Sequence, residues 1–201
     1  MSVITIDLMR HGEPVGGSRY RGQIDDPLSD KGWQQMRAAV VGHAPWDAIV
    51  SSPLTRCRAF AEELAATLQL PVAIQADFKE IGFGSWEGKT RAELAEIDPQ
   101  QLQQFYQDPI KYRPEGAEAL ADFSARVATE WQRMLEAQHG EHLLVVAHAG
   151  VIRVLICHAL GLPVEQMFRL QISNASISRV VLAEGKPPVL QFHNGRLGLF
   201  D

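Results

Sequence analysis

Cysteines and long apolar runs are scarce in this chain of 201 residues. Its two cysteines, Cys57 and Cys157, lie in apparently helical, partly apolar surroundings, which fits reduced thiols better than a disulfide framework. The chain has no run of about 20 apolar residues, the length that crosses a bilayer. The apolar run near the N-terminus has no basic segment before it and is interrupted by Asp7, so we find no signal peptide. We therefore expect a cytoplasmic protein without a membrane partner.

Positive charge is also in the minority. Nineteen lysines and arginines face 24 aspartates and glutamates, and the net charge of -5 with a pI near 5.8 argues against a nucleic-acid partner. An anionic ligand must then be attracted by a local group of arginines, which an acidic protein can still hold. With 46% hydrophobic and 21% charged residues, the chain is of ordinary globular composition and long enough for one core, so we expect a single domain over residues 1–201. The number of subunits stays open, a homodimer included.

Short apolar runs alternate with helical patterns along the chain and predict an α/β fold. The spacing of apolar residues predicts helices over residues 28–41, 54–70 and 151–160. Ser29 is a good N-cap for the first of these, and Pro53 is suited to the first position of the second. Strands are expected near residues 4–9, 48–51, 71–75, 142–147, 177–182 and 189–193.

Residues 89–140 contain helical patterns but no strand pattern. Thr90 and Glu93 form a capping-box signature for a helix that ends near residue 97. A second helix is expected over 98–107 and a long amphipathic one over 117–138. We expect this region to form a small helical cap over the edge of the sheet, within the same domain.

Two histidines follow strand patterns, and both are followed by small residues. Arg10 and His11 end the first run, and His148 ends the run at 142–147. Ligands in open α/β sheets bind beyond the carboxyl ends of the strands. Gly12 would let the backbone turn at a place where a side chain would obstruct a ligand or where the φ angle is strained. The small residues after His148 would expose backbone N–H groups at a helix N-terminus, where they could bind an anion. A single such histidine is usually structural, but two favour a reactive site, and we take His11 as its centre.

The pattern leaves two choices open around this site. Arg56 and Arg58 both lie early in the second helix, but only one can point at the site because residues two positions apart nearly oppose each other. Glu80 and Glu87 both lie in the glycine- and aromatic-rich segment 78–88, where burial would favour a protonated carboxyl group able to donate a proton. The two cations and one aromatic of residues 18–21 are expected to form a rim for the ligand.

Four segments of the chain together resemble the ordered motifs of the histidine phosphatase superfamily, which has the phosphoglycerate-mutase-like fold. The segments are residues 10–13, 51–56, 80–88 and 146–153. The resemblance implies a three-layer sandwich with a mostly parallel sheet and a small helical cap. It also selects Arg56 over Arg58, and Glu80 over Glu87 as the proton donor.

The resemblance further implies a mechanism without a metal or cofactor. The imidazole of His11 would attack phosphorus and form a phosphohistidine, while Glu80 would protonate the leaving group and then activate water. Positive groups would stabilise the transferring phosphoryl oxygens: Arg10, Arg56 and His148, the last if protonated. A metallohydrolase built on the two histidines is a weaker alternative, because no His/Asp cluster with ligand spacing is visible.

Two positions depart from the commonest family pattern: Pro14 stands where many members have Ser or Thr, and Gly17 stands three positions later. Many members have a phosphate-binding Asn where Gly17 stands here, so the donor must come from elsewhere. Backbone N–H groups of Gly16 and Gly17 or the hydroxyl of Ser18 could replace it, and Ala149 would add a backbone N–H on the other side.

The expected partner is a small phosphorylated substrate. The compact length, the loop at 16–17 and the segment 116–118 look most like the α-ribazole phosphatases of the cobalamin pathway, which implies α-ribazole 5'-phosphate. A phosphoglycerate-mutase-like phosphotransferase and a broad-specificity sugar phosphatase are alternatives. A noncatalytic phospholigand-binding module is a further one, and the complete residue set speaks against it.

Overall fold

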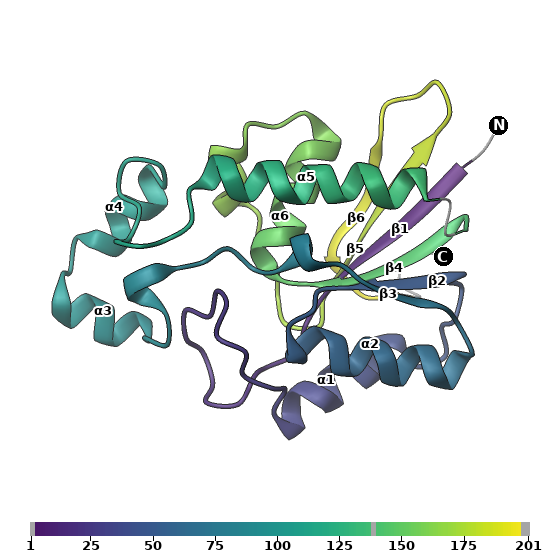
Figure 1. Cartoon of the computed structure of the whole chain (residues 1–201), viewed down its shortest axis with the longest axis horizontal. Helices are drawn as coiled ribbons and strands as arrows, with labels where there is room; N and C mark the ends of the chain where they lie inside the picture. The colour runs from purple at the N-terminus through teal and green to yellow at the C-terminus, as the bar shows by residue number, and fades with distance from the viewer. Residues whose placement is uncertain (1–2, 138–139, 198–201) are drawn as a thin grey trace.

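A six-stranded sheet lies at the centre of the computed structural model, which describes residues 3–137 and 140–197 (Figure 1). The strand order is β3-β2-β4-β1-β5-β6. Four strands are parallel: β1 (Val3–Arg10), β2 (Ala48–Ser51), β3 (Val72–Ile74) and β4 (His142–Ala147). Strand β5 (Ile177–Ala183) runs antiparallel to β1, and β6 (Val189–Gly195) pairs antiparallel with β5 and so runs in the same direction as the first four. The prediction of a mostly parallel sheet is confirmed.

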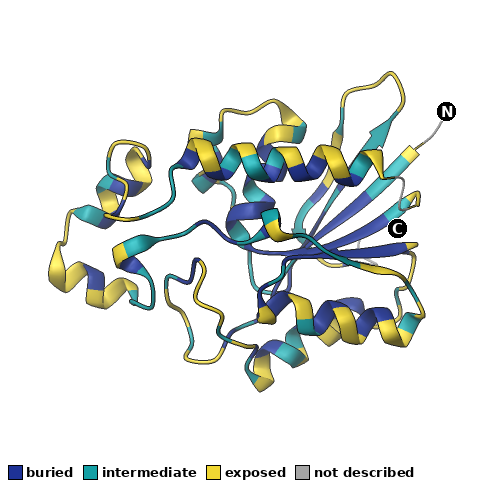
Figure 2. Ribbon diagram, in the orientation of Figure 1, coloured by how far each residue is buried: buried dark blue, intermediate teal, exposed yellow. Residues whose placement is uncertain are grey.

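Helices cover both faces of this sheet and form the two outer layers. One core packs the sheet against α1 (Asp30–Val40) and α2 (Thr55–Leu68), and the other packs it against α5 (Leu120–Glu136) and α6 (Ala149–Leu160). Figure 2 shows the consequence, since the central strands β1, β2 and β4 are buried over most of their length and the outward faces of the helices are exposed. Strands buried on both faces explain why the apolar runs of the sequence do not alternate with polar residues. The three-layer sandwich is thereby confirmed.

The helix boundaries differ from expectation at two places near the sheet edge. Ser29 caps α1 as predicted, its hydroxyl accepting from the Gly32 N–H at 3.0 Å. Leu54 is the N-cap of α2, so Pro53 precedes the helix and does not fill its first position. Helix α6 begins at Ala149, two residues earlier than predicted, which brings the first small residues after His148 into its opening turn.

The region 89–140 divides between the cap and the sandwich. Helices α3 (Arg91–Ile97) and α4 (Gln101–Gln107) project beyond the sheet edge (Figure 1), and the predicted capping box of Thr90 and Glu93 is present. They share a small apolar cluster with the 3-10 helix η2 (Gly84–Trp86). Helix α5 instead packs in the main core, because its apolar stripe faces the sheet.

Asp7 forms a buried polar network within the sheet. It lies in β1, has no exposed surface, and accepts hydrogen bonds from Trp46 Nε1 at 2.9 Å and His142 Nε2 at 3.0 Å. Arg179 on β5 adds two more, at 2.8 and 3.1 Å. Burial by itself raises the pKa of Asp7, but these hydrogen bonds outweigh it and hold that pKa below its usual value.

Both cysteines are free and buried, as the sequence predicts. Over the described ranges, none of the helices combines the length and the apolar character that a membrane span needs.

Candidate active site

The parallel pairing of β1 and β4 brings His11 and His148 together. Arg10 is in register with Ala147, and the His11 N–H donates to the Ala147 carbonyl at 3.0 Å. The two histidines that follow these strands therefore emerge side by side, with ring centroids 5.2 Å apart and ring planes at 63°. The structure places both at the carboxyl edge of the parallel strands, where the sequence predicts the site.

The hydrogen bonding of His11 defines which of its nitrogens faces outward. Nδ1 lies 2.7 Å from the Gly12 carbonyl oxygen, which can only accept, so Nδ1 carries the proton. Nε2 then keeps its lone pair. Burial lowers the pKa of His11 well below its usual value, and the nearby charges of Arg10 and Arg56 lower it further. His11 is therefore a neutral imidazole with a fixed tautomer.

His148 is fully buried at the N-cap of α6. Its Nε2 lies 2.7 Å from the Ser52 hydroxyl, and the Cys57 sulfur is about equally far from both ring nitrogens, at 3.7 and 3.6 Å. Burial lowers the pKa of His148 well below its usual value, with Arg56 adding to the effect. Because the ring is desolvated beside a cation, its neutral form is favoured over the protonated form that the sequence left open.

Two arginines lie beside the histidines: Arg56 is buried and Arg10 is partly buried. Arg10 donates to the Ile172 carbonyl at 2.6 Å, and burial lowers its pKa to about 10, so it remains a cation at neutral pH. Arg56 has no exposed surface and donates to the carbonyls of Ile24 and Gly22 at 2.7 and 2.9 Å. In both side chains Nε is buried without a hydrogen-bond partner within the described part of the chain.

The structure also answers the choice between the two arginines of α2. Arg58 is exposed and forms an ion pair with Glu62 at 2.7 Å, one turn further along the helix. Arg56 points inward beside the histidines, as the family resemblance implies.

Glu80 and Glu87 have different surroundings. Glu80 is 6% exposed and lines the same cavity as His11, and its two oxygens accept from the N–H groups of Ile81 and Gly150, both at 3.0 Å. Gly150 is in the first turn of α6, so the N–H group expected to meet an external anion instead holds this carboxylate. Glu87 accepts from backbone N–H groups of the neighbouring loops and lies outside the lining of the cavity.

The glycines and small residues of the predicted site have specific roles. A Cβ on Gly12 would lie 2.3 Å from the Gly32 carbonyl, so Gly12 is needed for close packing against α1, whereas the sequence suggested access for a ligand or a strained φ. Gly17 lines the cavity, but its N–H donates to the Pro14 carbonyl at 3.3 Å within a left-handed turn. Ser18 and Ala149 also line the cavity.

The cavity itself has a volume of about 200 Å³. Arg19, Tyr20 and Arg21 join Ser18 in its wall, so the segment expected as a rim does border it. The structure adds residues that sequence reasoning did not assign to the site: Phe83, Tyr106, Arg153, Phe168 and Asn174.

Two of these added residues had a signal in the sequence. Asn174 lies just before β5, and an antiparallel strand starts at the edge where its parallel neighbours end, so the residues before it border the site. Arg153 is one helical turn after Ala149 on α6 and thus on the same face. Its guanidinium donates to the Leu170 carbonyl at 2.8 Å and lies 5.6 Å from the centre of the Phe168 ring. Burial lowers the pKa of Arg153, while the charge of Glu80 opposes this shift.

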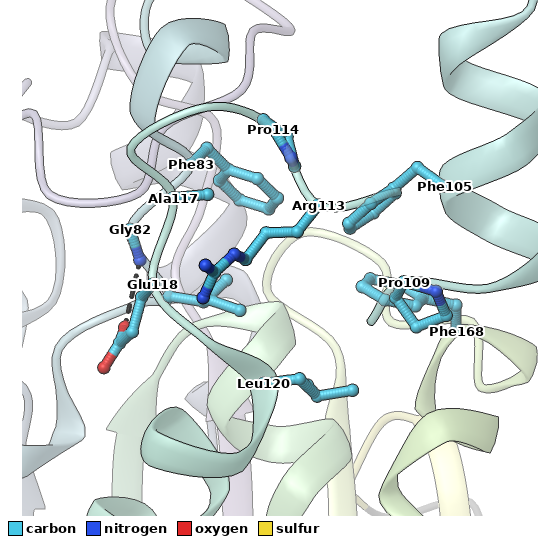
Figure 3. A pocket seen from close by; sticks show the side chains of 11 residues that line it. Gly82, Phe83, Phe105, Pro109, Arg113, Pro114, Ala117, Glu118, Leu120 and Phe168 are labelled. Atoms are coloured by element: carbon cyan, nitrogen blue, oxygen red, sulfur yellow. Dashed lines mark hydrogen bonds between the residues drawn. The ribbon is translucent and has the colours of Figure 1, made fainter. Parts of the chain in front are cut away.

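Tyr106 and Phe168 had no such signal. They come from the cap and from the 3-10 helix η3 (Val164–Arg169), and their rings pack 5.4 Å apart. A narrow apolar crevice of about 10 Å³ shares Phe83 and Phe168 with the cavity (Figure 3).

Among the described residues, no group of three or more His, Cys, Asp or Glu side chains is arranged to hold a metal ion.

The fold and the paired histidines with two neighbouring arginines define a phosphoglycerate-mutase-like protein. The chain matches the histidine phosphatase superfamily (branch 1) over residues 6–195 and belongs to that family. The family inferred from the four motifs is thereby confirmed.

Three comparisons illustrate the range of relatives. A bifunctional protein of Mycobacterium tuberculosis is 35% identical over 85% of this chain and 48% of its own length. The adenosylcobalamin/alpha-ribazole phosphatase of Escherichia coli is 29% identical over 86% of this chain and 87% of its own. The solved structure of a mycobacterial glucosyl-3-phosphoglycerate phosphatase is 27% identical, with a TM-score of 0.84 over 96% of this chain and 99% of its own. The chain thus spans about half the length of its mycobacterial curated relatives.

Proposed function

We propose that this chain hydrolyses small phosphomonoesters without a metal, through a phosphohistidine on His11. The observation that carries the proposal is the state of this imidazole. Its Nδ1 proton is held by the Gly12 carbonyl, and its Nε2 lone pair is available at a buried, cationic edge of the sheet. A nucleophile must be unprotonated to attack, and this one is kept so without a separate base.

The positive groups at this edge take the place that a metal occupies in many phosphatases. Arg10 and Arg56 are fixed through backbone carbonyls, and each retains a buried Nε without a partner among the described residues. Such preorganised donors stabilise the charge that spreads over the equatorial oxygens during phosphoryl transfer. His148 would gain a proton, or donate its N–H, only when the phosphate dianion arrives. Asn174 and Ser18 are uncharged donors that line the same cavity as His11, and we assign them the role of the family's missing Asn.

Glu80 completes the cycle as acid and then base. The His11 Nε2–phosphorus bond forms, the ester P–O bond breaks, and the departing alkoxide takes the proton of the Glu80 carboxyl group. Water then attacks phosphorus, the N–P bond breaks, and the released proton returns to Glu80. Each Glu80 oxygen accepts one backbone N–H and keeps a second lone pair for this exchange.

The mouth of the cavity supports a leaving group with a flat ring and hydroxyls. Tyr20, Phe83, Tyr106 and Phe168 line it, and Arg19 and Arg153 supply donors between these rings. Aromatic faces pack well against planar heterocycles, while arginines donate to sugar hydroxyls. These contacts favour α-ribazole 5'-phosphate as the substrate, the compound named for the Escherichia coli relative.

The test combines trapping of the intermediate with a substrate panel. The wild-type protein, quenched during turnover of labelled phosphomonoester, should give an acid-labile, base-stable phosphoenzyme, and His11→Ala should give none and lose turnover. His158→Ala is the matched control, because His158 is exposed on α6 and lies outside the lining of the cavity. Label on another residue, or turnover retained by His11→Ala, would contradict the mechanism.

The panel should include α-ribazole phosphate, simple sugar phosphates and 3-phosphoglycerate. The highest kcat/KM on α-ribazole phosphate would support the substrate proposed here. Similar values for all sugar phosphates would indicate a broad-specificity phosphatase, and label moved to a sugar-acid hydroxyl would indicate a phosphotransferase. Binding of phosphate without any turnover would indicate a noncatalytic module.

A further inference from the structure

Arg126 on α5 lies behind the segment that carries Glu80, and all the N–H groups of its guanidinium are used. Nε and Nη2 donate to the two oxygens of Glu118 at 2.7 and 2.8 Å. Nη1 donates to the carbonyls of Asp77 and Lys79 at 2.6 and 2.8 Å, and Nη2 also donates to the carbonyl of Glu80 at 3.2 Å. An arginine has five N–H donors, so none is left for a ligand.

Glu118 extends this contact to the other side of Glu80. It lies just before α5, its Oε2 accepts from the Gly82 N–H at 3.1 Å, and its own N–H donates to the Gly82 carbonyl at 2.9 Å (Figure 3). The backbone is therefore held on both sides of Glu80, from Asp77 to Gly82. The side chains of Arg126 and Glu118 are only 20% and 19% exposed, so solvent screens this pair less than the exposed pairs on the same helix.

We propose that Arg126 and Glu118 are positioning residues that hold Glu80 in place for proton transfer, an inference that rests on the acid–base role of Glu80 in the proposed function. The segment from Lys79 to Phe83 has no helix or strand of its own, so the hydrogen bonds of regular structure do not fix it. At its far end the Glu80 carboxylate is held by the Gly150 N–H at the start of α6. Arg126 connects this loop to α5, and Phe123, against which its guanidinium stacks at 4.8 Å, packs close to Gly150. Two rigid helices thus hold the acid from opposite ends.

A lysine cannot reproduce this arrangement. Its ammonium has three donors from one point, whereas the guanidinium reaches three carbonyls and two carboxylate oxygens in one plane. Arg126→Lys, Arg126→Met and Glu118→Gln should therefore all loosen the loop while leaving His11 and its arginines untouched.

The dependence of the rate on the leaving group distinguishes a positioning role of Arg126 from a merely structural one. An alkyl phosphate needs a proton on its departing oxygen, and an aryl phosphate with an acidic phenol does not. A displacement of about 1 Å at a catalytic group can slow a reaction about 10²-fold. Single-turnover phosphorylation of Arg126→Met should thus fall by about this factor with the alkyl substrate and only a few-fold with the aryl one. Arg126→Lys and Glu118→Gln should show the same selectivity to a smaller extent.

Arg133→Met is the matched control. Arg133 is on the same helix and also contacts the 77–80 segment, but only through the side chain of Asp77, at 3.4 Å, and its own side chain is 62% exposed. It should behave as wild type with both substrates. Thermal unfolding of every variant shows whether the protein remains folded, and Glu118→Gln keeps the test available if Arg126→Met does not fold.

The double variant Arg126→Met with Glu80→Gln distinguishes a failure of the positioning role of Arg126 from a failure of the acid role of Glu80. If Arg126 acts through Glu80, adding Arg126→Met to Glu80→Gln should cause no further loss, because the acid is already gone. Equal slowing of both substrates by Arg126→Met, or an additive loss in the double variant, would overturn the positioning role. If the slowing caused by Glu80→Gln does not depend on the leaving group, the acid role of Glu80 in the proposed function is contradicted, and not only the positioning role of Arg126 and Glu118.

Discussion

A single methyl group at Gly150 should separate the stability of this protein from its activity. Gly150 is in the first turn of α6 with ordinary, right-handed backbone angles, so Gly150→Ala suits the helix and would by itself stabilise it by up to about 1 kcal/mol. The added Cβ, however, would lie 2.2 Å from Glu80 Oε1 and 3.0 Å from its Cδ, whereas ordinary contacts begin at 3.4 Å. The Glu80 carboxylate must therefore move away by about 1 Å, and a displacement of this size at a catalytic group can slow the reaction about 10²-fold.

The assay compares melting temperature with hydrolysis of an alkyl and an aryl phosphate. Gly150→Ala should melt within a few degrees of wild type, yet phosphorylate about 10²-fold more slowly from the alkyl substrate, with little change for the aryl one. Gly82→Ala is the control, since Gly82 lies two residues from Glu80 and an added Cβ there has only ordinary contacts, 3.6 Å or longer. Wild-type turnover of the alkyl phosphate by Gly150→Ala would refute the reasoning, because the acid would then not be needed where the structure places it.

Three further predictions concern charge. Dialysis against EDTA should leave turnover intact because arginines stabilise the phosphoryl oxygens, and loss of activity that a divalent ion restores would reverse this. In an NMR titration His11 and His148 should stay neutral down through pH 6.5, since burial first and the neighbouring arginines second lower their pKa values; a midpoint at or above 6.5 would contradict the buried site. Asp7→Asn should lower the free energy of unfolding by about 3 kcal/mol at pH 7. Because the pKa of Asp7 is lower in the folded than in the unfolded protein, the difference in unfolding free energy between wild type and variant should be fully present above the unfolded pKa of about 3.9. It should shrink as the pH falls through the folded pKa. Urea denaturation at several pH values measures this dependence.

Much of the fold could be predicted because its strands are strongly patterned. The run at residues 142–147 is buried almost throughout, and a short continuous apolar run of this kind is typical of a central parallel strand. The helix boundaries differ from the prediction where the local sequence signals for a helix start compete with one another. Pro53 suits the first turn of a helix, but the chain places it before Leu54, and Ala149 and Gly150 join α6 although neither is a marked start signal.

The site could be predicted in part for the same reason. Arg10, His11 and His148 follow strand ends, whose positions in a parallel sheet are fixed by topology. The choice of Arg56 over Arg58 depends on the rotation of α2 about its axis, which the sequence pattern did not determine. Tyr106 and Phe168 reach the cavity through packing of the cap against η3, a tertiary contact with no counterpart in local sequence.

Glu87 is a carboxylate close to the site, as a proton donor would be, but its contacts stabilise the loops around the site. Its carboxylate accepts from the N–H groups of Gln23 at 2.9 Å and Ile24 and Phe83 at 3.0 Å, so it joins the 22–24 segment to the loop that follows Glu80. Arg56 holds the opposite, carbonyl side of that same segment. Glu87 thus holds the N–H groups of this stretch and Arg56 holds its carbonyl groups. These carbonyls fix Arg56 in place, although it has no carboxylate partner among the described residues. The rigidity of this stretch keeps the unpartnered Nε of Arg56 in place beside the two imidazoles, where a phosphoryl group would need it.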